Sequence, residues 1–241
     1  MTESDGPLTY HYTFTFPDGR AHAFTVALDP KTLNLIRATP QTAPPDWTKL
    51  STCKCPHCPL DEAAHPWCPA ATSLTDIVEL FSGAISYEEV DVCVETETRR
   101  YQKRTTMQKG LSALIGLYMV TSGCPVMGKL KPMVRHHLPF ARLDETQYRA
   151  ISMYLLAQFF IARHGRTPDW SLKKLSEIYK DIQTLNIHFS KRLNAVTQGD
   201  ASLNAFAILD VFAGTISFAI DENVFNDLEQ PFEPYLEEGT P

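Results

Sequence analysis

The sequence predicts an α+β fold, in which a small antiparallel sheet is followed by a mostly helical body. Three observations support this prediction. Aromatic and polar residues alternate near the N-terminus, as they do in strands with one buried face. A stretch dense in proline and cysteine follows, and its prolines exclude regular structure. Through most of the remaining chain, apolar residues recur at three- and four-residue steps, which is typical of helices.

The first 38 residues are expected to form a β-hairpin. Residues 8–16, LTYHYTFTF, place four aromatic side chains on one strand face, namely Tyr10, Tyr12, Phe14 and Phe16. After a PDGR turn, residues 22–28 repeat the alternation. One further strand is expected near 88–98, where valines alternate with polar residues. Together these segments predict a sheet made of the hairpin plus one strand.

Residues 39–72 are expected to form a Cys/Pro-rich loop, and residues 73–241 a mainly helical body that contains the strand near 88–98. A chain of 241 residues fits one domain that spans its whole length. Helical periods cover residues 74–86, 106–120, 145–164, 171–196 and about 201–220. The segment 145–164 is apolar nearly all round, which predicts a central buried helix.

The composition excludes several classes of protein. With 44% hydrophobic and 21% charged residues, the chain is neither collagen, nor an extended coiled coil, nor wholly disordered. The longest apolar run is shorter than the roughly 18 to 20 residues that span a bilayer, so no membrane segment is expected. The N-terminus lacks a basic region followed by an apolar stretch, so the sequence predicts a cytoplasmic protein.

Basic residues concentrate in one segment, 99–143, which holds nine Lys and Arg and no acid, although the formal charge of the whole chain is -6. Such a segment is a candidate for binding an anionic ligand, and it does not exclude nucleic acid. The candidate anion-binding residues are Lys129, Lys131, Arg135, His136, His137 and Arg142. Alternatively, the acidic C-terminal stretch, 221–241, folds back on this segment.

The six cysteines predict a metal site, because a cytoplasmic chain more often uses cysteine for metal or redox chemistry than for disulfides. Four of them share a feature: Cys55, Cys58, Cys68 and Cys124 are each followed by proline. Composition alone would give about 0.4 such steps. A Cys-Pro step holds a thiolate at a rigid bend. These four are the predicted ligands, with Cys53 as the reserve.

Zinc is the predicted metal, and an iron–sulfur cluster is the alternative, since four thiolates suit both. A zinc ion would tie the loop to the TSGCP turn around Cys124. His57 or His65 could replace one thiolate. The tetrapeptide CPHC, 55–58, equals the redox dithiol of some disulfide oxidoreductases, but Pro59 and the lack of a preceding βαβ pattern argue against that chemistry. If Cys124 is not a ligand, it is a candidate nucleophile with His136 or His137 as its base.

Five short motifs support a family resemblance: CPL at 58–60, CPAA at 68–71, TSGCP at 121–125, LKPM at 130–133 and HLPFA at 137–141. In combination they resemble an uncharacterised family of bacterial proteins. The resemblance implies the ligand set Cys55, Cys58, Cys68 and Cys124, and it implies no activity. Cys53 lies outside the family's pattern, and His57 stands where asparagine is expected.

The sequence therefore predicts a cytosolic four-cysteine metal-binding protein, with structural zinc in a binding or regulatory module of unknown partner. The alternative is an iron–sulfur enzyme or redox protein that uses the basic segment 99–143 to bind an anionic substrate. Whether the protein is an enzyme stays open at this point.

Overall fold

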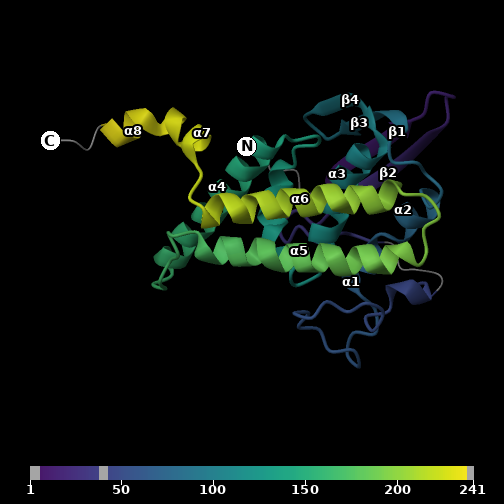
Figure 1. The fold of residues 1–241 in the computed structure, drawn as a ribbon, viewed down its shortest axis with the longest axis horizontal. Helices are drawn as coiled ribbons and strands as arrows, with labels where there is room; N and C mark the ends of the chain where they lie inside the picture. The colour runs from purple at the N-terminus through teal and green to yellow at the C-terminus, as the bar shows by residue number, and fades with distance from the viewer. Residues whose placement is uncertain (1–5, 38–42, 238–241) are drawn as a thin grey trace.

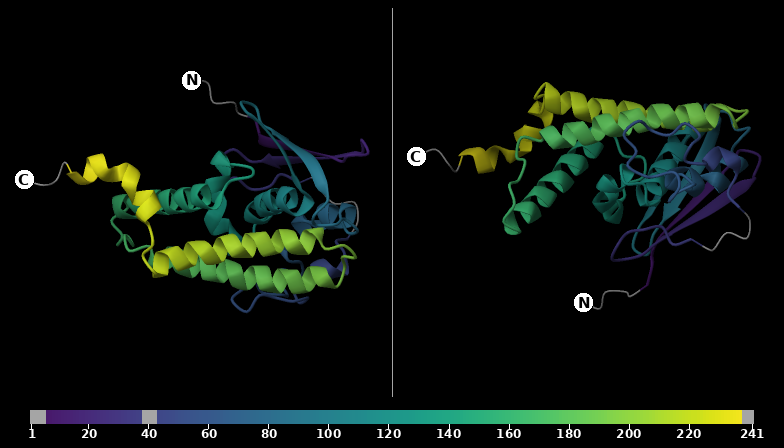
Figure 2. Two further views of the ribbon diagram at one scale, coloured as in Figure 1. Left: turned by 45° about the horizontal axis from the view of Figure 1, so that its top comes forward. Right: turned by 90° about the horizontal axis from the view of Figure 1, so that it is seen from below.

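The fold has three layers, which confirms the α+β prediction (Figure 1). It is seen in a computed structural model that describes residues 6–37 and 43–237. The layers are an antiparallel sheet, the helix α3 (Met107–Thr121), and the helix pair α5 (Lys173–Asn194) and α6 (Ala201–Asp221). Figure 2 shows α3 between the sheet and this pair.

The sheet of the described residues has four strands in the order β2-β1-β3-β4, all antiparallel. They are β1 (Leu8–Thr15), β2 (Ala21–Leu28), β3 (Glu89–Glu95) and β4 (Arg100–Thr106). The predicted hairpin and third strand are confirmed. The prediction of a single later strand is wrong, because β4 pairs with β3 along its full length. Its sequence, RYQKRTT, is charged and does not alternate, as is common for an edge strand.

The core runs from the sheet through α3 to the α5 and α6 pair. The four aromatic residues predicted on one face of the hairpin are all buried, as are the valines of β3. At Gly110 the helix lies so close to the sheet that a Cβ would stand 2.9 Å from side-chain atoms of both Phe14 and Val92. This close contact fixes the position of α3, and with it the turn that follows α3.

Of the remaining helices, only α4 (Leu143–Arg163) is long among the described residues. The others are α1 (Pro69–Ser73), α2 (Thr75–Leu80), α7 (Asn226–Glu229) and α8 (Glu233–Glu237), with 3-10 helices η1 (Asp46–Thr48), η2 (Met127–His136) and η3 (Gln230–Phe232). The helix expected over 74–86 ends already at Leu80, whereas those expected near 106–120, 171–196 and 201–220 are confirmed.

Helix α4 contradicts the prediction of a central buried helix. Its buried residues are Ala150, Tyr154 and Gln158. By contrast, Leu156 is 54% exposed and Phe159 is 50% exposed. The helix therefore packs along one narrow face and leaves apolar side chains at the surface.

The described part of the acidic C-terminal stretch does not fold back on the basic segment. Figure 1 shows α7 and α8 projecting beyond the ends of α5 and α6. Among the described residues, one helix, α6, is long and apolar enough to cross a membrane as judged by length and composition alone. In this fold α6 packs against α3 and α5.

Candidate metal centre

The Cys/Pro loop is held at its two ends by backbone pairing. The amide of Leu50 donates to the carbonyl oxygen of Pro66 at 2.8 Å, and the amide of Cys68 donates to that of Thr48 at 2.8 Å. This isolated bridge brings the entry and exit of the loop together next to α1. Cys68 thereby acquires a fixed place directly before the first turn of α1.

Cys55, Cys58 and Cys124 stand at tight turns. The amide of Cys58 donates to the carbonyl oxygen of Cys55 at 3.0 Å, which closes the CPHC turn. Gly123 follows the end of α3 with φ of 93°, a left-handed conformation that favours glycine. The amide of Cys124 then donates to Oγ of Ser122 at 3.1 Å. These turns direct the chain after α3 toward the loop.

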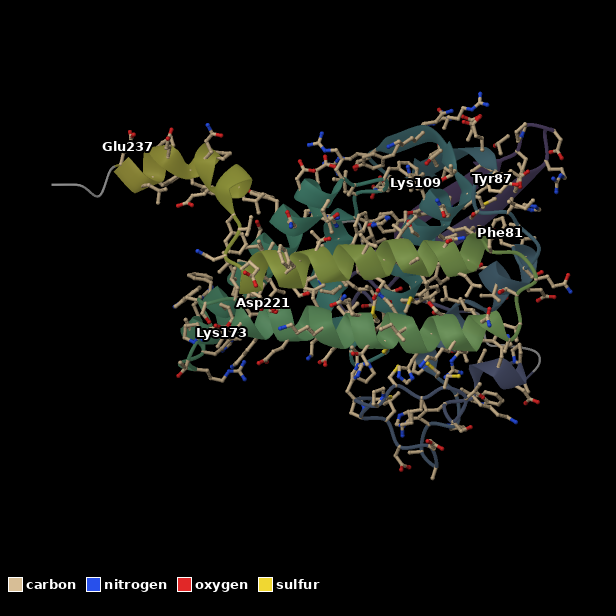
Figure 3. All side chains as sticks on the ribbon, viewed as in Figure 1. Phe81, Tyr87, Lys109, Lys173, Asp221 and Glu237 are labelled. Atoms are coloured by element: carbon tan, nitrogen blue, oxygen red, sulfur yellow. The ribbon has the colours of Figure 1, made fainter. Side chains whose placement is uncertain are left out.

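The four predicted ligands line one small cavity of about 20 Å³, whose wall also includes Leu185 and Phe189 of α5. Figure 3 shows sulfur atoms near the place where the loop passes beneath α5. Cys124 is buried, and Cys55, Cys58 and Cys68 are partly buried. Cys53 borders the same cavity but is exposed. None of the six cysteines forms a disulfide.

The surroundings of Cys55 disfavour a redox dithiol. Burial first, and then the nearby thiols of Cys68, Cys124 and Cys58, raise the pKa of the Cys55 thiol to about 12. Burial also raises the pKa of Cys124. A redox-active or nucleophilic cysteine requires the opposite change, a lowered pKa. The CPHC turn also does not begin a helix, so no helix N-terminus stabilises a thiolate there.

A buried arginine lies beside the thiols. Arg192, near the end of α5, is 2% exposed, and its Nη1 donates to the carbonyl oxygens of Trp47 and, at 2.7 Å, Lys49. No carboxylate of the described residues forms an ion pair with it, and the ionisable groups that act on its charge are the thiols of Cys68, Cys53 and Cys55. Arg192 therefore clamps the loop entry and places a positive charge at the thiol cavity.

The thiols converge without reaching ligand geometry. Within residues 6–37 and 43–237, no three His, Cys, Asp or Glu side chains are spaced so that they could hold a metal ion. His57 is placed in the same loop, with a buried Nε2 atom that has no hydrogen-bond partner, and His65 is exposed. The structure thus gathers the predicted ligands around one cavity, but no three of the described side chains could hold an ion as they stand.

A family model matches residues 9–233, and its description is domain of unknown function DUF6901. The chain belongs to the DUF6901 family. This match confirms the resemblance to an uncharacterised family, while the bacterial origin and the individual motifs stay predictions. Neither the curated proteins nor the solved structures contain a match to the chain.

The six candidate anion-binding residues of this DUF6901 protein do not converge. Nζ of Lys131 donates to Oδ1 of Asn34 at 2.6 Å, and Arg135 donates to the carbonyl oxygen of Pro30, so both attach η2 to the segment after β2. Arg142 pairs with Asp144 at 2.5 Å. The other three residues are Lys129 and His136, which are exposed, and His137, which lies against the sheet.

Only His137 and Arg142 of that set line a second, larger cavity, which has a volume of about 670 Å³. This second cavity lies between α3, α6 and η2. It adjoins the thiol cavity: Val126 borders the thiols and Met127 borders the large cavity. On α5, Leu185 likewise borders the thiol cavity, and Asn186 borders the large cavity.

His137 predicts a specific pH dependence of stability. Burial, and then the charge of Arg149, lower the pKa of His137 to about 3, and its Nε2 lies 2.5 Å from the hydroxyl of Tyr12. A folded-state pKa below the ordinary 6.5 means that the unfolded chain binds the proton first. Stability should therefore be complete above about pH 6.5 and fall toward pH 3, by at most about 1.4 kcal/mol per pH unit.

Urea unfolding at a series of pH values measures this slope. His137→Gln should flatten it, since glutamine can keep a hydrogen bond to Tyr12 and does not titrate. The matched control is His136→Gln, at an exposed position. Equal slopes for wild type and His137→Gln would contradict the assignment.

Proposed function

We propose that this DUF6901 protein binds one structural zinc ion through Cys55, Cys58, Cys68 and Cys124, and that the ion fastens the Cys/Pro loop to the helical body of a binding or regulatory module. One observation carries the proposal: thiols from three separate segments line a single cavity, and no disulfide joins them. Tetrahedral thiolate ligation is typical of structural zinc.

The charge of Arg192 supports deprotonated thiols at this place. A buried cation is unfavourable unless an opposite charge accompanies it. Zinc with four thiolates carries a net charge of -2, which would offset the guanidinium. Neutral thiols would leave Arg192 without compensation, because the described residues offer it no carboxylate. Metal binding therefore explains why an arginine is placed there.

The positions of the cysteines favour Cys124 over Cys53 as the fourth ligand. The thiols that act on Cys55 are those of Cys68, Cys124 and Cys58. Cys53 is exposed, and its backbone has a φ of 50°. Since no three of the described side chains could hold an ion as they stand, the proposal requires the ligand side chains to rearrange on binding. The prolines after the ligands restrict that movement to small changes.

An iron–sulfur cluster is the second candidate, and the neighbouring large cavity favours it. A cluster at the thiols would lie across the 124–127 turn from a cavity large enough for a substrate. This arrangement suits an iron–sulfur enzyme or redox protein whose anionic substrate contacts the basic segment. The cytoplasm is the expected location in both cases, because reduced thiols persist there.

Colour and elemental analysis of anaerobically purified protein separate the two candidates. Zinc predicts a colourless protein with one zinc per chain. A cluster predicts iron, sulfide and thiolate-to-iron absorption near roughly 400 nm. Purified protein with neither metal, which also takes up neither zinc nor a reconstituted cluster, would contradict both.

A further inference from the structure

The large cavity has the size and shape of a site for an elongated apolar molecule. Its volume of about 670 Å³ falls within the roughly 300 to 1,000 Å³ of small-molecule sites. Its lining runs from Gln108 to Val120 on α3 and from Asn204 to Ile216 on α6. Twelve residues of helix rise by about 18 Å. Both helices begin beside the segment 84–86, so the two linings run along each other.

The wall is mostly apolar, with one exception in its interior. Leu117, Phe212 and Ile216 are representative of the apolar residues that line it. Asn186 of α5, which is 1% exposed, also lines the cavity, and its side chain pairs with the carboxyl of Asp210 on α6. Apart from each other, neither the Asn186 amide nor Oδ1 of Asp210 has a hydrogen-bond partner. A polar group of a bound molecule would supply a further partner for this buried pair, which has unused hydrogen-bonding capacity.

The charged residues of the lining are all basic. Lys103 of β4, Lys109 of α3 and Arg149 of α4 border the cavity together with Arg142. Figure 3 labels Lys109 on the helix behind α6. Among the described residues no Asp or Glu lines the cavity, and none forms an ion pair with Lys103, Lys109 or Arg149. The lining therefore favours an anionic group.

We propose that this cavity binds an amphipathic carboxylate of the fatty-acid type, whose alkyl chain lies along α3 and α6 and carries one hydroxyl or carbonyl group that pairs with Asn186. The carboxylate contacts the basic residues of the lining. Each part of the ligand corresponds to one observation: the apolar wall favours the chain, the cations without an ion pair favour the carboxylate, and the buried Asn186–Asp210 pair favours an internal polar group. This site does not depend on the identity of the metal.

Isothermal titration calorimetry of the full chain, in its metal-loaded form as purified, tests the proposal. The probes are dodecanoate, dodecanol and a series of monohydroxydodecanoates. We expect dodecanoate to bind at least about tenfold more tightly than dodecanol, a difference of about 1.4 kcal/mol. We also expect one member of the hydroxy series to bind more tightly than dodecanoate. Absence of saturable binding by every carboxylate, or equal binding of acid and alcohol, would overturn the proposal.

Two sets of variants assign the contacts. Asn186→Leu, similar in size, should abolish the preference for the hydroxy acid and keep dodecanoate binding. Lys103→Gln combined with Lys109→Gln should weaken carboxylate binding about tenfold, whereas Lys129→Gln, outside the cavity, should not. A hydroxy preference that survives Asn186→Leu would mean that the hydroxyl does not pair with Asn186, and this would overturn that part of the proposal.

Discussion

Cys68→Ser is expected to release the metal and to free the Cys/Pro loop from the body. Structural zinc contributes on the order of 10 kcal/mol to the folding of small sites. The loop offers little to replace this, since the described bonds that hold it are the bridge at 48–50 and 66–68 and the clamp by Arg192. Elemental analysis should show loss of the metal, and limited proteolysis should show new cleavage between residues 50 and 66.

Cys93→Ser is the matched control for this variant. Cys93 lies on β3, where its sulfur accepts a hydrogen bond from Nε of Arg100 at 3.2 Å, and it does not line the thiol cavity. This variant should keep the metal and the proteolytic resistance of the loop. Unchanged metal content in Cys68→Ser would remove that residue from the site. Cys58→Ser is expected to behave like Cys68→Ser.

Arg192→Met should destabilise the protein by about 3 to 5 kcal/mol, because it breaks a buried charge interaction and leaves the carbonyl oxygens of Trp47 and Lys49 without their donor. Urea unfolding measures the loss, and the exposed neighbour Lys191 supplies the control Lys191→Met. The loss of stability should be larger in the zinc-bound protein than after chelation, because Arg192 no longer faces thiolates once the zinc is removed. The same loss in both forms would show that Arg192 acts on the loop backbone alone.

The sequence predicted those parts of the fold in which one face is apolar and the other polar. The hairpin and α5 have such patterns, and the structure confirms them. Strand β4 has no alternation, because it lies at the sheet edge and most of its residues face solvent or are half-buried. The prediction that α4 is buried was wrong because a helix with an exposed apolar face and a helix in the core can have the same composition.

The candidate site, too, was predicted only where the sequence carries a local pattern. Cysteine-proline steps marked the four thiols that the structure brings together. Arg192 was missed because a cation in the last turn of a helix is ordinary, and only the fold places it against the loop. Asn186 left no signal in the sequence, since an asparagine within an amphipathic helix looks solvent-exposed until its neighbours are known. The basic segment was recognised, yet several of its members are bound to the protein itself.

The metal content of Cys124→Ser compared with that of Cys53→Ser tests the central claim most directly. Both variants remove a thiol that borders the same cavity, so each serves as the control for the other. The proposed site predicts that Cys124→Ser loses the zinc while Cys53→Ser keeps one zinc per chain. Retention of stoichiometric zinc by Cys124→Ser, together with loss from Cys53→Ser, would contradict it: the metal would then belong to the loop alone and would not fasten it to the helical body.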